Sequence, residues 1–126
     1  MAIKGDFLSA TITAGSDLSG LQYYVVALHD GNRAINGHEA CGILQNKPKT
    51  GEAALVGYVG LMKYRAGGAI TQGNKLAVDS NSTMIKAASG DLIKGEALNT
   101  VTSGSIGMGI FSFPSFFGVD SATAAS

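Results

Sequence analysis

The stretch that decides the fold is residues 52–64, Glu52-Ala53-Ala54-Leu55-Val56-Gly57-Tyr58-Val59-Gly60-Leu61-Met62-Lys63-Tyr64. A helix is disfavoured here, because each of its two internal glycines would cost about 1 kcal/mol in a helix interior. Read as a strand, the segment is apolar on both faces, whereas a one-sided antiparallel sheet needs one apolar face. One face carries Ala53, Leu55, Val59 and Leu61, and the other carries Val56, Tyr58, Met62 and Tyr64. We expect a long strand buried on both sides, either within the domain or with one face against a neighbouring subunit.

Turn signals on both sides of this segment predict a series of short strands. Strands are predicted at residues 21–28, 40–45, 69–71, 75–78, 84–87 and 106–113, with a weaker one at 34–35. Turns every 8 to 12 residues or so are typical of a sandwich or barrel. The 18 glycines favour the same architecture, and a helical turn is expected only at residues 97–102. The predicted fold is all-β, a small barrel or sandwich of short antiparallel strands.

The length of 126 residues predicts a single domain with less ordered ends. We divide the chain into an extended N-terminal arm at residues 1–16, a β-barrel or sandwich domain at 17–113 and a flexible C-terminal tail at 114–126. Residues 1–16 also fit a short strand, because Ala10, Ile12 and Ala14 alternate with hydroxyl residues. No segment resembles a signal peptide or an apolar membrane span. With one cysteine, Cys41, a soluble protein made in a reducing cytoplasm is expected.

The charge content predicts a protein that works in an assembly. Only 14% of the residues are charged, and nine basic side chains balance nine acidic ones. A nucleic-acid partner is not expected, because neutralising phosphates takes a clustered basic excess. Low charge also removes the usual protection against association. Part of the surface is therefore expected to be covered by another protein chain.

The sequence contains no pattern typical of a catalytic, metal or cofactor site. His29, Asp30, His38, Glu39 and Cys41 form the densest polar cluster, but their spacing is not that of a zinc site, and a turn-surface role is favoured. Cys41 lies in an apolar strand, where a free cysteine usually packs as a small hydrophobe. Gly107 and Gly109 have strand spacing, so they are expected to admit a close backbone or a large side chain. We expect no enzyme activity and no cofactor.

Two groups of residues are candidate protein contacts. Lys47, Lys49, Lys63 and Arg65 place four of the nine basic residues within 19 positions. They form either an electropositive contact for an acidic partner or an ordinary solvated loop and strand end. Phe113, Phe116 and Phe117 belong, with Phe111, to an aromatic C-terminal cluster. This cluster either closes the barrel or docks onto a neighbouring protein.

Four segments carry a resemblance to a known family. They are Ala40-Cys41-Gly42-Ile43-Leu44-Gln45-Asn46-Lys47-Pro48, Gly51-Glu52-Ala53-Ala54, Ala66-Gly67-Gly68-Ala69-Ile70-Thr71-Gln72-Gly73 and Gly90-Asp91-Leu92-Ile93-Lys94-Gly95-Glu96-Ala97-Leu98. Their order resembles small capsid cement, or head-decoration, proteins of tailed phages, and Gly42-Ile43-Leu44 is similar to the lambda type. The resemblance implies a compact β-rich homotrimer at three-fold or quasi-three-fold positions on the capsid exterior, bound to the major capsid protein. It implies no active-site residues, and it does not extend to the Phe-rich end.

Two other classes of protein fit parts of the sequence. One is another virion component, such as a tail or fibre subunit. The other is a biotinyl or lipoyl carrier domain, because Leu61-Met62-Lys63 is similar to its modified-lysine hairpin. Lys63 lacks a following methionine, however, and lies near the end of a long strand. For a cement protein, we expect the N-terminal arm to lie across capsomer seams.

Overall fold

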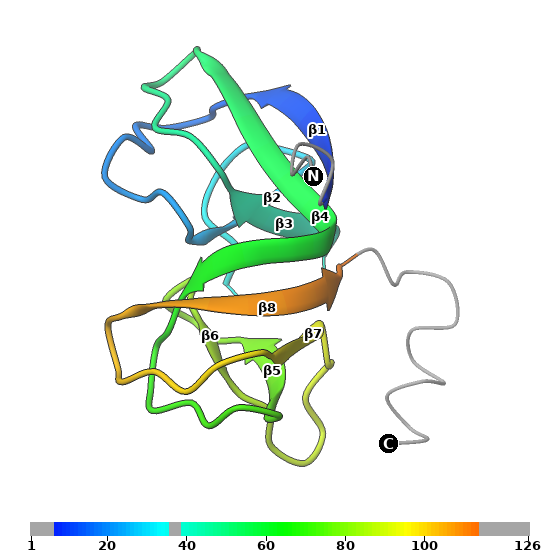
Figure 1. Ribbon diagram of the computed structural model, residues 1–126. Helices are drawn as coiled ribbons and strands as arrows, with labels where there is room; N and C mark the ends of the chain where they lie inside the picture. The colour runs from blue at the N-terminus through cyan, green and yellow to red at the C-terminus, as the bar shows by residue number, and fades with distance from the viewer. Residues whose placement is uncertain (1–6, 36–38, 114–126) are drawn as a thin grey trace.

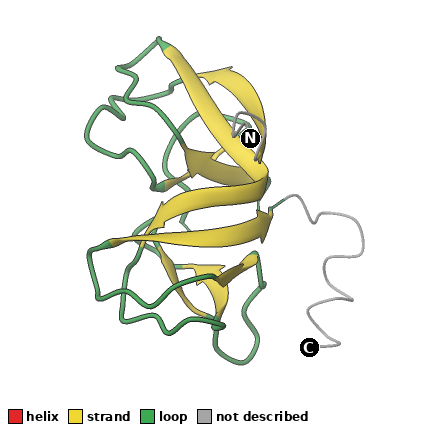
Figure 2. Cartoon of the chain, in the orientation of Figure 1, coloured by secondary structure: helices red, strands yellow, loops and turns green. Residues whose placement is uncertain are grey.

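The computed structural model describes residues 7–35 and 39–113, and there the chain is all-β, as the sequence predicts (Figures 1 and 2). The strands are β1 (Phe7–Thr13), β2 (Val25–Ala27), β3 (Cys41–Leu44), β4 (Ala53–Arg65), β5 (Lys75–Val78), β6 (Met84–Lys86), β7 (Gly95–Ala97) and β8 (Ile106–Ser112). No helix occurs in this part of the chain, including residues 97–102.

The long strand β4 organises the whole sheet. The strand order is β2-β3-β4-β8-β7-β5-β6, and β1 pairs with β4 outside this path. The first part of β4 pairs with β1, and the second part pairs with β8 from Val59↔Ser112 to Arg65↔Ile106. Figure 1 shows β4 bending between the two halves of the fold. Gly60, where the two pairings overlap, has a φ of 121°, a conformation that side-chain-bearing residues rarely adopt.

The strands that follow β4 form a nearly closed barrel. Ala66, the residue after β4, makes a parallel bridge with Met84 at the start of β6. Next to it, the backbone N–H of Gly67 donates to the carbonyl of Met84 at 2.8 Å. The path β4-β8-β7-β5-β6 therefore returns to the end of β4, which leaves few unpaired strand edges in this half.

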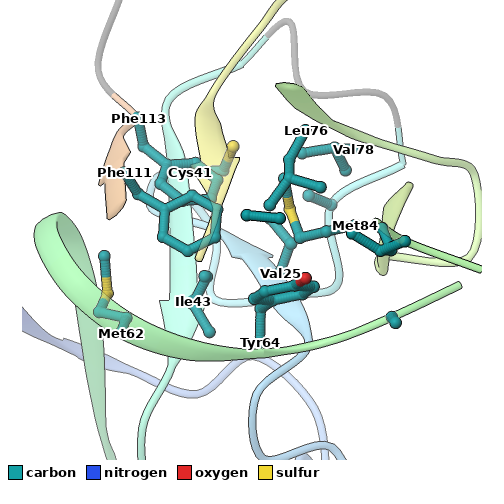
Figure 3. Close-up of a cluster of buried hydrophobic side chains, with 14 residues drawn as sticks. Val25, Cys41, Ile43, Met62, Tyr64, Leu76, Val78, Met84, Phe111 and Phe113 are labelled. Atoms are coloured by element: carbon teal, nitrogen blue, oxygen red, sulfur yellow. The ribbon is translucent and has the colours of Figure 1, made fainter. Parts of the chain in front are cut away.

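The hydrophobic core has two parts, and β4 contributes to both. The larger cluster joins barrel residues, including Met62, Tyr64 and Phe111, to Val25 of β2 and Ile43 of β3 (Figure 3). The smaller one lies among the earlier strands and includes Leu18, Val26, Leu44 and Val56.

The two faces of β4 are buried unequally. On the inner face Val56, Met62 and Tyr64 are buried, whereas on the outer face Val59 is half-buried and Leu61 is exposed. Burial of both faces within the domain is therefore wrong. Burial of the outer face by a neighbouring subunit stays a prediction.

Three predicted strands are shorter than expected or absent, because their backbone groups form turns or isolated bridges instead of a strand ladder. In residues 21–28, the N–H of Tyr24 donates to Leu21 in a turn, so β2 begins only at Val25. Residues 69–71 reduce to a single bridge between Ile70 and Val101, and 34–35 form no strand. The expected helical turn at 97–102 is wrong, because the chain enters it from β7, a strand that the sequence analysis missed.

The N-terminal segment is a strand where it is described. β1 pairs with β4 from Phe7↔Gly60 to Thr13↔Ala53, with a register shift after Leu8. For residues 1–16 the sequence left open an extended arm or a short strand. The structure shows a strand at Phe7–Thr13. Residues 1–6 and the predicted tail at 114–126 lie outside the described residues.

None of the described residues forms a helix that is long and apolar enough to cross a membrane.

Candidate protein-contact site

Three of the four predicted basic contact residues lie around one apolar side chain. Lys47 and Arg65 line a depression of about 260 Å³, and Lys63 lines a neighbouring depression of about 300 Å³. Ile106 lines both of them. Arg65 and Lys63 reach this surface from alternate positions of β4, and Lys47 reaches it from the loop after β3. The fold therefore places the apolar side chain of Ile106 between three basic residues.

Lys49 lines neither of these depressions and lies near two acidic residues, Glu52 and Asp17. Its backbone N–H donates to Oε1 of Glu52 at 2.8 Å. Hydrogen bonds from the Ser19 hydroxyl and backbone lower the pKa of Asp17, and the charge of Lys49 lowers it further. The positive charge of Lys49 is thus balanced by nearby negative charges. The geometry favours its interpretation as a solvated loop residue.

Arg33, which the sequence analysis did not single out, joins the basic group through Tyr24. The guanidinium carbons of Arg33 and Arg65 lie 5.9 Å and 5.6 Å from the centroid of the Tyr24 ring. Such stacking is a cation–π interaction, in which the ring face attracts the cation. Arg33 and Arg65 are 32 positions apart, so only tertiary structure brings them together. The sequence feature that could have pointed to Arg33 is composition, because Arg33 and Arg65 are the two arginines of the chain.

Phe113 belongs to the core. It is completely buried, and its ring stacks on Phe111 with the centroids 5.4 Å apart (Figure 3). Its backbone N–H donates to the carbonyl of Tyr58 at 2.8 Å, and its own carbonyl accepts from Nζ of Lys94 at 3.1 Å. Of the two predicted roles, Phe113 therefore has the one in which it closes the barrel. Its side chain is not exposed for docking onto a neighbouring protein. The candidate contacts Phe116 and Phe117 lie outside the described residues.

An exposed apolar surface covers the outside of the later strands. We call it the outer apolar face and define it as Leu61, Ile93, Leu98 and Ile110, whose exposed fractions are 38%, 47%, 40% and 49%. Leu61 of β4 lies directly opposite Ile110 of β8, and Ile93 and Ile110 line a shallow depression of about 440 Å³. Neighbouring exposed apolar side chains of this kind mark contact surfaces.

One ion pair borders this face. Lys75 Nζ lies 2.6 Å from Oε1 of Glu96, the residue opposite Ile110 in β7. Both side chains are substantially exposed, so the pair contributes little to stability.

Cys41 has the properties of a packing residue. It is buried in the core beside Ile43 and Phe113 (Figure 3). Burial raises the pKa of the Cys41 thiol to about 12. The thiolate, which is the nucleophile, is therefore negligible near neutral pH.

The histidine-rich turn is a surface feature. His29 is exposed, and its ring nitrogens lie 3.5 Å from Oδ2 of Asp30 and 3.9 Å from Oε1 of Glu39. Cys41 is buried, so these residues are not presented together, and His38 lies outside the described residues. Among the residues described, no three metal-binding side chains gather.

Lys63 is not placed as in a carrier domain. It lies inside β4, opposite Met108 of β8, and not at the tip of a hairpin. A modified lysine has to reach a distant active site, which a mid-strand position does not favour.

Comparison with known proteins identifies a shared fold. No known protein family and no curated protein sequence matches the chain. Among solved structures, the chain is similar to the crystal structure of the head fibre gp8.5 N base in bacteriophage phi29. The TM-score is 0.66 with 18% sequence identity, and the match covers 84% of this chain and 94% of that one. The two chains thus share a fold.

Proposed function

We propose that this chain is a structural protein of a phage virion that binds the outside of the capsid and stabilises the shell. The observation that carries the proposal is the fold, which matches a head-fibre base of a phage over 84% of this chain and 94% of that one. The four sequence segments that resemble head-decoration proteins are compatible with the same class. The major capsid protein is the partner in this proposal, and the host bacterial cytoplasm is the place of synthesis.

The proposed assembly is a trimer at three-fold or quasi-three-fold positions. The outer apolar face supports self-association, because Leu61 and Ile110 expose apolar surface from two paired strands. A low charge content places little repulsion between copies. Three linked subunits bind a shell with avidity even where each contact is weak.

A second candidate is the base of a head fibre rather than a cement protein. The specific observation in its favour is that the similar structure is itself a head-fibre base. Both candidates bind a capsid, but a cement protein remains close to the shell, whereas a fibre base carries a projecting element. Imaging of the bound protein separates them.

We also propose that the role is non-catalytic. Support comes from Cys41, whose buried thiol has a raised pKa and packs in the core. Lys94 is 3% exposed, and burial lowers its pKa, but its Nζ donates to the Phe113 carbonyl inside the core.

The test uses purified protein and capsids that lack it. The two are mixed, sedimented and imaged by cryo-electron microscopy, with Lys86→Gln as a control for an exposed charge that lines none of the depressions described above. Compact density at three-fold positions is expected for a cement protein, and a projecting rod supports the fibre base. Absence of co-sedimentation at every salt concentration would overturn the capsid proposal.

A further inference from the structure

The two arginines of the chain converge on one tyrosine. The sequence has seven lysines and only Arg33 and Arg65 as arginines, yet both guanidinium groups lie against the ring of Tyr24. Arginine offers a planar fork of donors that matches a carboxylate, whereas lysine acts as a point charge. The residues best suited to bidentate recognition are thus concentrated at one place.

Each guanidinium is held in position by acceptors of the protein. Nη2 of Arg33 donates to the carbonyl of Asn81 at 2.9 Å, and its Nε lies 3.4 Å from the Ser82 hydroxyl. Nη1 of Arg65 donates to the carbonyl of Gly104 at 2.6 Å. These bonds use only some of the five N–H donors of each arginine. The remaining donors are preorganised, which reduces the entropic cost of binding a ligand.

The arginines line a polar recess of about 420 Å³ that contains no acidic side chain. Tyr24, Asn81 and Thr83 also line it. The carboxylate of Asp79 lies behind the wall of the recess. Its Oδ1 accepts from the backbone N–H and the hydroxyl of Thr83 at 2.9 Å and 2.8 Å, and its Oδ2 would lie 2.8 Å from a Cβ placed on the lining residue Gly67.

The two positive charges have no carboxylate partner within the part of the chain that the structure describes. The ion pairs there belong to His29 and Lys75, not to either arginine. In addition, Nε of Arg65 is buried without a hydrogen-bond acceptor in the described residues. Two neighbouring like charges favour the approach of an opposite charge.

We propose that this recess binds the carboxylate of an acidic side chain from a partner protein. Charge-assisted bonds from two arginine forks suit a carboxylate, and the bounded recess accommodates one side chain. A nucleic-acid backbone is disfavoured, because a chain with zero net charge provides no extended basic track. The inference deepens the proposed function by naming the chemistry of the contact. It rests on that function only for the identity of the partner.

The site is tested by nuclear magnetic resonance on the full chain. The two arginine Nε–H signals are followed during titration with acetylated, amidated triglutamate peptide, with the triglutamine peptide as control and inorganic phosphate as a competing ligand. We expect both signals to shift saturably with triglutamate alone. No shift, an equal shift with triglutamine, or a stronger response to phosphate overturns the proposal.

Conservative variants separate a binding role from a structural one. Arg33→Lys combined with Arg65→Lys keeps both charges but removes both forks, so affinity for triglutamate should fall at least about tenfold. The amide signals of Thr83 and Gly104 report binding here, Lys86→Arg is the matched control, and thermal unfolding verifies the fold. Unchanged affinity in a folded double variant contradicts the proposal.

Capsid sedimentation with the same double variant distinguishes the two proposals. Loss of capsid binding by the variant supports a carboxylate contact on the capsid. Peptide binding without capsid binding by the wild type leaves the site intact and overturns the proposed function. Capsid binding that the double variant retains overturns the carboxylate contact and leaves the function intact.

Discussion

The ring of Tyr64 lies against the backbone of Gly107, its direct cross-strand neighbour in the β4–β8 pair. A Cβ placed on Gly107 would lie 2.7 Å from both Cζ and the hydroxyl oxygen of Tyr64. This contact explains why a glycine occupies a strand interior, where it is otherwise unfavourable. It also confirms the prediction that this glycine admits a large side chain.

Substitution of this glycine should therefore destabilise the fold. We expect Gly107→Ala to lower the free energy of unfolding by about 1–3 kcal/mol, as for other overpacked cores. Gly68→Ala is the matched control, because no atom beyond its adjacent residues lies within 4 Å of its Cβ position, and its effect should stay below about 1 kcal/mol. Urea denaturation measures both, and equal effects would contradict the packing argument.

Removal of the Tyr64 hydroxyl should stabilise the protein. This hydroxyl is buried without a hydrogen-bond partner in the described residues, and burial raises its pKa. Tyr64→Phe deletes an unsatisfied polar group, so we expect a gain of about 1 kcal/mol at neutral pH, measured by chemical denaturation. A loss of stability would mean that the hydroxyl has an acceptor.

Alkaline pH should destabilise the fold through Cys41. The folded-state pKa is raised from 9.0 to about 12, so between these values the folded state holds a proton that the unfolded state has lost. Stability from this group is therefore complete below pH 9 and falls by up to about 1.4 kcal/mol per pH unit above it.

The measurement compares unfolding free energies of wild type and Cys41→Ala at pH 8 and pH 10. The variant should show a shallower decline, whatever its starting stability. Lys94 acts in the opposite direction, because its lowered pKa makes stability rise with pH below 10.5. The difference between the two pH dependences reports Cys41 together with its charge interaction with Lys94, and identical slopes would refute its role.

Truncation at the N-terminus should have two distinct effects. Deletion of residues 1–16 removes β1, including Phe7 and Ile12, which pack against the two core clusters, so a large loss of stability is expected. Deletion of residues 2–6 leaves β1 intact and is the proper test of an arm across capsomer seams. Thermal unfolding and capsid sedimentation report the two effects. Normal stability without β1 would contradict the pairing with β4.

Polar substitution of the outer apolar face should reduce association without loss of folding. Leu61→Ser and Ile110→Ser change exposed, paired positions, so the unfolding free energy should change by less than about 1 kcal/mol. Sedimentation equilibrium should show weaker self-association. Ile35→Ser, also exposed but outside this face, is the control. Equal association of all three variants and the wild type would remove this face from the interface.

The sequence alone determined the strand class of the protein and its longest element. The apolar run of β4 with its internal glycines and the turn dipeptides are local signals, so they identify strands without knowledge of their partners. Local patterns could not identify β7, which has three residues and is fixed by its pairing with β5 and β8. They also could not show that Phe113 is buried, because burial depends on what lies across the barrel.

For the candidate site too, some features could be predicted from the sequence and others depend on tertiary structure. The clustering of Lys47, Lys49, Lys63 and Arg65 in the sequence predicted either a basic contact or an ordinary solvated loop and strand end. The pairing of Arg33 with Arg65 was not, because the residues are distant in the chain and meet only when β4 passes beside Tyr24. Periodicity and composition are local properties that the sequence carries by itself. Which charges share a recess depends on long-range strand pairing, and this the tertiary structure alone decided.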